Sequence, residues 1–158
     1  MNRRAGLERR VVVGTDGSER GSEAVRWAII ETRARGARLE VLLVRPKEDL
    51  PPGTSFARGP HGRAPIQDGR PMTDQVTKIC EQLAADIVIE ASVRTGDPAS
   101  ELLAAAHGAD LLVLGSPPEG PLGQLAFGSV AAACVRHATC PTVLVSPRAA
   151  HRFSPSSP

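Results

Sequence analysis

Residues 11–18 of this 158-residue chain decide its fold, and they read Val-Val-Val-Gly-Thr-Asp-Gly-Ser. Three consecutive β-branched residues without polar alternation are typical of a strand buried on both faces, as in a parallel sheet covered by helices. The turn Gly-Thr-Asp-Gly leads into residues 18–35, where apolar side chains recur at helical spacing up to a natural stop at Gly36. The stretch therefore predicts the first β-strand, turn and α-helix of an α/β domain.

The same alternation continues along the chain. Short apolar runs bounded by Gly, Asp or Pro predict four more strands, at 39–44, 87–89, 111–114 and Thr142–Val145. Helical spacing predicts helices at 73–85 and 128–138, and Asp97-Pro98 is a strong start signal for another helix. The element order predicts a doubly wound α/β domain with right-handed crossovers.

The domain organisation follows from length and composition, since 158 residues correspond to one domain. Residues 1–9 are expected to form a basic flexible arm, 10–147 a single domain, and 148–158 a disordered tail. Residues 45–71 hold six prolines and four glycines, so we expect a long irregular loop there and no hidden element.

Charge and residue usage exclude several function classes. Lys plus Arg is 19 and Asp plus Glu is 17, and the excess lies in the first ten residues, so the body offers no face for nucleic acid. No apolar run approaches the roughly 18 residues of a membrane span. Three cysteines do not suggest a disulfide framework, which makes the cytoplasm the default compartment.

Three glycine-containing segments follow predicted strands, where open parallel sheets bind ligands. They are residues 14–18, 96–98 and the Gly-rich stretch 115–129. Asp16 is placed to accept hydrogen bonds from ribose hydroxyls, and Gly128-Ser129 opens a helix whose N-terminus favours phosphate. The alternative is that these glycines only make turns and that Asp16 only caps the first helix.

Several of these motifs, taken together, resemble the universal stress protein family. The resemblance rests on residues 11–18, Gly-Asp-Pro at 96–98, Leu-Leu-Val-Leu-Gly-Ser at 111–116, Gly-Ser-Val at 128–130 and residues 135–145. It implies a five-stranded parallel sheet of strand order 3-2-1-4-5, with helices on both faces. It also implies a homodimer through the last strand, Thr142–Val145, which agrees with the need of a short apolar edge strand for a partner.

Nucleotide-binding members of that family carry Gly-x2-Gly-x9-Gly-Ser/Thr after the fourth strand. This chain has Gly115 and Gly128-Ser129 at the matching positions, but Pro118 replaces the second glycine. Proline lacks an N–H and fixes φ near −65°, and Glu119 adds a negative charge, so the motif predicts weakened triphosphate binding. The resemblance implies an ATP or other adenine-nucleotide site, with or without Mg²⁺, whose residues are Thr15, Asp16, Leu43, Leu114, Gly115, Gly128, Ser129 and Val130.

The function hypothesis is a dimeric stress-response protein that binds an adenine nucleotide as a regulatory ligand read by an unknown protein partner. The alternative is a nucleotide-free dimerisation and interaction module with a degenerate phosphate loop. No nucleophile elbow or Walker motif is present, so we expect no enzyme, with slow ATP hydrolysis left open. Cys134, His137 and Cys140 lack the fourth ligand of a zinc site, and Cys80 and Cys134 are expected in the core.

Overall fold

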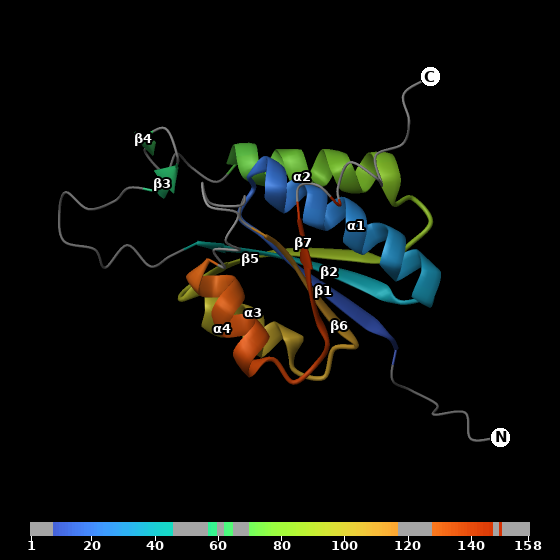
Figure 1. The fold of residues 1–158 in the computed structure, drawn as a ribbon. Helices are drawn as coiled ribbons and strands as arrows, with labels where there is room; N and C mark the ends of the chain where they lie inside the picture. Colours follow the sequence, from blue (N-terminus) through green and yellow to red (C-terminus); the bar gives the residue numbers. More distant parts are fainter. Residues whose placement is uncertain are drawn as a thin grey trace.

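The computed structural model describes residues 8–45, 57–59, 62–64, 70–116, 128–146 and 149. Strands and helices alternate through most of this length, as Figure 1 shows. The order is β1 (Arg10–Thr15), α1 (Glu19–Arg35), β2 (Arg38–Arg45), β3 (Ala57–Gly59), β4 (Gly62–Ala64), α2 (Arg70–Leu83), β5 (Ile89–Thr95), α3 (Pro98–Ala106), β6 (Leu111–Gly115), α4 (Ser129–His137) and β7 (Thr142–Val145).

The main sheet has five strands in the order β5-β2-β1-β6-β7, and every neighbouring pair is parallel. Numbered among these five strands alone, that order is 3-2-1-4-5. The doubly wound α/β fold, its five-stranded sheet and its strand order are therefore confirmed. Because the order reverses direction at β1, the chain crosses to the other side of the sheet between β5 and β6.

Helices cover both faces of the sheet, which divides the core into two clusters. Helices α1 and α2 pack on one face, where Val11, Val13 and Val41 lie in the core, and α3 and α4 pack on the other, against Val12 and Leu42 (Figure 1). Alternating residues of β1 thus enter different clusters, as the side-chain period of a strand requires. The continuous apolar runs of the central strands are explained by this double burial.

One predicted strand was misplaced. Residues 87–89 were expected to form it, but β5 runs from Ile89 to Thr95. The reason is that β5 is an edge strand, in which Glu90, Ser92 and Arg94 alternate with Ile89, Ala91 and Val93. A search for continuous apolar runs detects central strands and overlooks an alternating edge strand.

The expectation of no hidden element in 45–71 is wrong in one respect. Strands β3 and β4 pair antiparallel as a separate two-stranded sheet, with Arg58 opposite Arg63. Neither strand has an apolar pattern that sequence reasoning could detect. Helix α2 also begins at Arg70, three residues before its predicted start, with Pro71 in its first turn. The rest of this segment, most of the expected arm and nearly all of the expected tail lie outside the described residues.

Candidate functional site

The candidate site lies along the edge of the sheet at which the parallel strands end. In the register of the sheet, Thr15 at the end of β1 lies beside Leu43 of β2, and Gly14 lies beside Leu114 of β6. Gly115 follows Leu114, and Asp16 follows Thr15. The fold thus brings together five of the eight predicted site residues, which are separated by up to 100 positions in the sequence.

Asp16 is exposed and accepts two hydrogen bonds from Ser18, one from its backbone N–H at 2.9 Å and one from its hydroxyl. The cap of α1 is Ser18 itself, whose hydroxyl oxygen accepts from the N–H of Gly21 at 3.2 Å. Asp16 is therefore not the capping residue. Its Oδ1 accepts both hydrogen bonds and so stabilises the turn, whereas no donor within the described part of the chain hydrogen-bonds to its Oδ2.

Gly115 has a packing role that the motif did not reveal. A Cβ built on it would lie 3.0 Å from the carbonyl oxygen of Arg20. The end of β6 and the first turn of α1 are therefore so close that a Cβ at residue 115 would require the facing backbone to shift by a few tenths of an ångström. Gly115 is explained by this contact alone, so it carries no independent evidence of a ligand.

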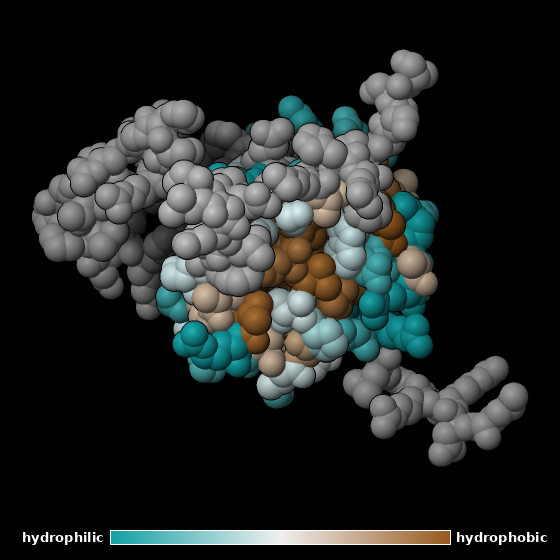
Figure 2. Space-filling model, in the orientation of Figure 1, coloured by the Kyte–Doolittle hydropathy of each residue, from teal (hydrophilic) through white to brown (hydrophobic). Residues whose placement is uncertain are grey.

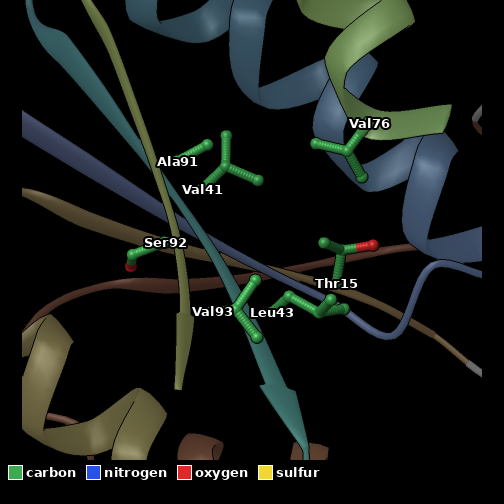
Figure 3. Close-up of a pocket in the computed structure, with 7 residues that line it drawn as sticks. All are labelled: Thr15, Val41, Leu43, Val76, Ala91, Ser92 and Val93. Carbon is green, nitrogen blue, oxygen red and sulfur yellow. The ribbon is translucent and has the colours of Figure 1, made fainter. Parts of the chain in front are cut away.

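A small cavity that opens to solvent lies on the α2 side of this edge; the empty space between its walls is about 300 Å³ when the adjoining open solvent is counted. Figure 3 shows its lining: Thr15, Val41, Leu43, Val76, Ala91, Ser92 and Val93. The side chain of Ser92 points away from the others, and so does the hydroxyl oxygen of Thr15 (Figure 3). That oxygen accepts a hydrogen bond from the N–H of Gly17 at 3.1 Å. The walls are consequently almost entirely apolar.

The two leucines expected to line one slot lie on opposite faces of the sheet. Leu43 lines the cavity on the α2 side. Leu114 is buried in the cluster under α3 and α4, where its Cδ2 lies 2.8 Å from the position of a Cβ on Gly14. Leu114 therefore cannot touch a ligand in the cavity, and its contribution to the site is the backbone position that it gives to Gly115.

Helix α4 begins without a side-chain cap. Its N-cap is Gly128, and among the described residues no side chain accepts a hydrogen bond from its first turn. The first helical hydrogen bond runs from the N–H of Ala132 to the carbonyl of Gly128 at 2.9 Å. The preceding N–H groups, those of Ser129, Val130 and Ala131, therefore have no partner within the helix. Around Gly128, no described atom comes within 4 Å of an added Cβ.

The cysteines are core or half-buried residues. Cys134 is fully buried on the inner face of α4 and Cys80 packs against the other cluster, which confirms their expected place in the core. Burial raises the pKa of both thiols, with smaller contributions from Asp97 at Cys134 and Glu81 at Cys80. Within the described ranges, no three His, Cys, Asp or Glu side chains come together as a metal site.

Sequence reasoning missed four of the side chains that form the cavity: Val41, Val76, Ala91 and Val93. Val41 could have been predicted from the sequence, because it lies two residues before Leu43 and therefore on the same face of the strand. Ala91 and Val93 required the correct bounds of β5, where they pair with Val41 and Leu43. Pro118 and Glu119, on which the weakened motif rests, lie outside the described residues.

The fold and the arrangement of its carboxyl edge define a doubly wound α/β protein with a candidate ligand site where the strand order reverses. The model of the universal stress protein family matches residues 8–146, and the chain belongs to that family. Over the described residues, no helix combines the length and apolar character needed to cross a membrane.

Three relatives illustrate the range of the family. A universal stress protein of Thermus aquaticus is 30% identical over 150 residues, covering 85% of this chain and 96% of its own length. Universal stress protein Rv2623 of Mycobacterium tuberculosis is 31% identical over 153 residues, covering 85% of this chain. The match covers only 46% of that relative, so this chain spans about half of the mycobacterial protein. The third, MJ0531 of Methanocaldococcus jannaschii, is 30% identical over 144 residues, covering 88% of this chain and 82% of its own length.

Solved structures show the same fold. A universal stress protein determined in complex with cAMP is 26% identical, with a TM-score of 0.65, covering 89% of this chain and 98% of its own. A universal stress protein of Archaeoglobus fulgidus is 21% identical, with a TM-score of 0.64, covering 88% of this chain and 98% of its own.

Proposed function

We propose that this protein binds an adenine nucleotide, ATP or AMP, as a regulatory ligand at the carboxyl edge of the sheet. The observation that carries the proposal is the start of α4. No described atom lies within 4 Å of a Cβ added to Gly128, and the N–H groups of Ser129 and Val130 have no partner in the helix. A helix start with free N–H groups and the positive end of its dipole is a binding site for phosphate.

The rest of the nucleotide would extend from α4 across β6 and β1 toward β2. Asp16 is exposed beside this path and would accept hydrogen bonds from ribose hydroxyls through its Oδ2. The apolar cavity with Thr15 and Leu43 would take the adenine ring. The solved relative in complex with cAMP supports this ligand class, because cAMP also carries adenine, ribose and phosphate.

In this proposal the nucleotide is held and not turned over. The groups assigned to the ligand are backbone N–H groups, a hydroxyl, a carboxylate and apolar side chains. They bind and orient a nucleotide, but no residue among them is assigned as a base for an attacking water. A divalent cation, if bound, would arrive with the phosphates. An unidentified protein partner would read the bound state, and the cysteine usage favours the cytoplasm as the compartment.

The experiment has two steps. The purified protein is denatured and the supernatant is assayed for adenine nucleotide; the nucleotide-free protein is then titrated with ATP and AMP by calorimetry. We expect released nucleotide or a saturable heat. No released nucleotide and no heat at millimolar ATP would reject nucleotide binding.

A second candidate function is a nucleotide-free interaction module, favoured by Pro118 in place of the second glycine. A charge-assisted hydrogen bond contributes roughly 1.5–3 kcal/mol, so restoring one N–H is expected to tighten ATP binding about tenfold or more in Pro118→Gly. Unchanged or weaker ATP binding in this variant would show that the loop does not run in the family register.

Both candidates include a homodimer through β7. Among the described strands it pairs only with β6, and so it forms one edge of the sheet. Its Val143 and Leu144 are only half-buried, and Figure 2 shows an apolar area where Figure 1 places β7. Antiparallel pairing of two β7 strands would cover this surface. Replacing Val143 by Lys is expected to weaken association through β7, which sedimentation velocity would show as smaller assemblies than the parent chain forms; unchanged association would reject this interface.

A further inference from the structure

The opposite edge of the sheet, β5, exposes apolar side chains beside backbone groups that no other described strand pairs. Four large apolar side chains are exposed in the described part of the chain, and two of them, Val88 (70%) and Val93 (46%), lie at this strand. Ala91, between them, is exposed as well. A strand edge of this kind is a template for pairing with another strand.

The hydrogen bonds to β2 show which backbone groups of β5 remain available. The carbonyl of Val88 accepts from the N–H of Leu39 at 2.9 Å, and the N–H of Gly96 donates to the carbonyl of Arg45 at 2.8 Å. Even-numbered residues therefore direct their backbone groups toward β2. Because direction alternates along a strand, Ile89, Ala91, Val93 and Thr95 direct theirs outward.

We propose that β5 pairs antiparallel with β5 of a second copy of this chain, about a two-fold axis that passes through Ser92. Such an axis must stand perpendicular to the sheet, so a residue faces a partner residue on the same side of the sheet. In this register Ala91 exchanges backbone hydrogen bonds with Val93, and Ile89 with Thr95. These are the four residues whose backbone groups point outward.

The charges of β5 are complementary in this register. Glu90 lies opposite Arg94 of the second copy, and by symmetry Arg94 lies opposite Glu90. Both belong to non-hydrogen-bonded pairs, in which side chains approach most closely. Glu90 is 70% exposed at its side chain and its contact with Arg38 is long, at 3.7 Å. Arg94 is 38% exposed and contacts Glu40 and Glu101 at 3.4 and 3.6 Å.

Ser92 supplies an independent indication. Its hydroxyl oxygen is buried, yet it has no hydrogen-bond partner in the described part of the chain. On the two-fold axis the two Ser92 side chains would lie opposite each other, and a change of side-chain rotamer would bring the shielded oxygens together so that one O–H donates to the other oxygen. Charges on an edge strand usually prevent pairing. Here their order along the strand favours self-pairing, because a second copy of the strand places opposite signs together in this register.

Cysteine cross-linking tests the register directly. In a background with Cys80→Ser and Cys140→Ser, the variant Ser92→Cys places two thiols across the axis. A non-hydrogen-bonded pair has a Cα separation of about 4.5 Å, within the range that a disulfide bridges. Ala91→Cys and Val93→Cys are the matched controls, because each would lie diagonally from its own copy, at about 7–8 Å.

Under mild oxidation we expect a covalent dimer joined at residue 92, identified by peptide mass spectrometry, and at least tenfold less cross-linking at 91 or 93. Cross-linking at 91 or 93 in preference to 92 would overturn the register. No cross-linking at any of the three positions would overturn the interface. Neither result bears on nucleotide binding or on β7.

Reversal of one charge provides the second test, made on the full chain by sedimentation velocity over a concentration series. Glu90→Arg would place Arg opposite Arg94 of the other copy at two symmetric positions. We expect association through β5 to weaken about tenfold or more. The control Glu81→Arg makes the same charge change on the exposed side of α2. Equal association in both variants would overturn the proposed pairing.

Discussion

Among the helices that begin at the carboxyl edge of the sheet, α1, α3 and α4 differ in one respect in their first turns. The start of α1 is capped by the hydroxyl of Ser18, and the start of α3 by the carboxylate of Asp97, which accepts from the N–H of Ser100 at 2.9 Å. The start of α4 has Gly128 at the same position and no side-chain cap. In α1 and α3, a side chain thus accepts a hydrogen bond from an N–H group of the first turn. In α4, the N–H groups of the first turn remain available to a ligand.

The glycines near this edge of the sheet also differ in whether close packing requires them. Gly14, Gly21 and Gly115 each lie against atoms that a Cβ would strike. Gly128 has none nearby, and its φ of −57° suits any residue. Within the described chain, neither packing nor backbone conformation explains Gly128, so its small size is best explained by a ligand that approaches the start of α4.

The largest effect is expected from a carboxylate placed at the uncapped start. Gly128→Asp would cap α4 and repel phosphate, so ATP binding should fall by roughly 10- to 150-fold, the equivalent of about 1.5–3 kcal/mol, while the melting temperature stays or rises slightly. Calorimetry and thermal melting measure the two effects. Thr139→Asp, which adds the same charge beyond the other end of α4, is the control. Equal weakening in both variants would contradict the assignment.

A pair of glycine substitutions tests the packing argument. Gly115→Ala forces a Cβ against the carbonyl of Arg20 and is expected to lower the free energy of unfolding by roughly 1–3 kcal/mol. Gly128→Ser adds side-chain atoms where space is open and supplies a cap, so the free energy of unfolding should change by only a few tenths of a kcal/mol. Urea denaturation measures the free energy of unfolding of both variants. Similar losses would contradict the claim that packing requires a glycine at 115 but not at 128.

Removal of the α1 cap measures the stability that a side-chain cap contributes, which α4 lacks. Ser18→Ala deletes the hydroxyl that accepts from Gly21 and that donates to Asp16. The expected loss is about 1 kcal/mol in the free energy of unfolding. Thermal melting of this variant beside Ser129→Ala provides the check, because the hydroxyl of Ser129 caps nothing in the first turn of α4. A loss as large in Ser129→Ala would contradict the comparison.

The smallest effect is the pH dependence of the α3 cap. Hydrogen bonds from the side chain and the backbone of Ser100 hold the pKa of Asp97 below its ordinary value of 3.8. A depressed pKa stabilises the fold above 3.8, and that contribution is lost as pH falls through the lower, folded-state value. Stability measured from pH 5 to pH 2 should therefore fall less steeply in Asp97→Asn than in the parent chain. Parallel curves would exclude a contribution from this carboxylate.

Most of the fold could be predicted from local sequence, because the central strands are buried on both faces and keep continuous apolar runs. Edge strand β5 could not, since Glu90 and Arg94 interrupt its apolar residues and its pattern resembles a loop followed by a helix start. The same error hid the cavity, because Ala91 and Val93 become neighbours of Val41 and Leu43 only once the register of β5 is known.

The site was predictable as a set of positions but not as a set of side-chain directions. The strand ends placed Thr15, Asp16 and Leu43 together, as parallel connectivity requires. Local pattern could not show that Leu114 faces the opposite cluster, because that depends on how β6 is aligned with β1. Nor could it show that Gly115 is fixed by the carbonyl of Arg20, a contact between segments that are 95 residues apart.

The central claim, that the uncapped start of α4 holds the phosphates of a nucleotide, is tested most directly by amide NMR of ¹⁵N-labelled protein titrated with ATP. The account predicts saturable shifts of the Ser129 and Val130 amides that are larger than those of Gly21 and Ser100 at the two capped helix starts. Saturable shifts confined to other parts of the chain, or none at millimolar ATP, would contradict it.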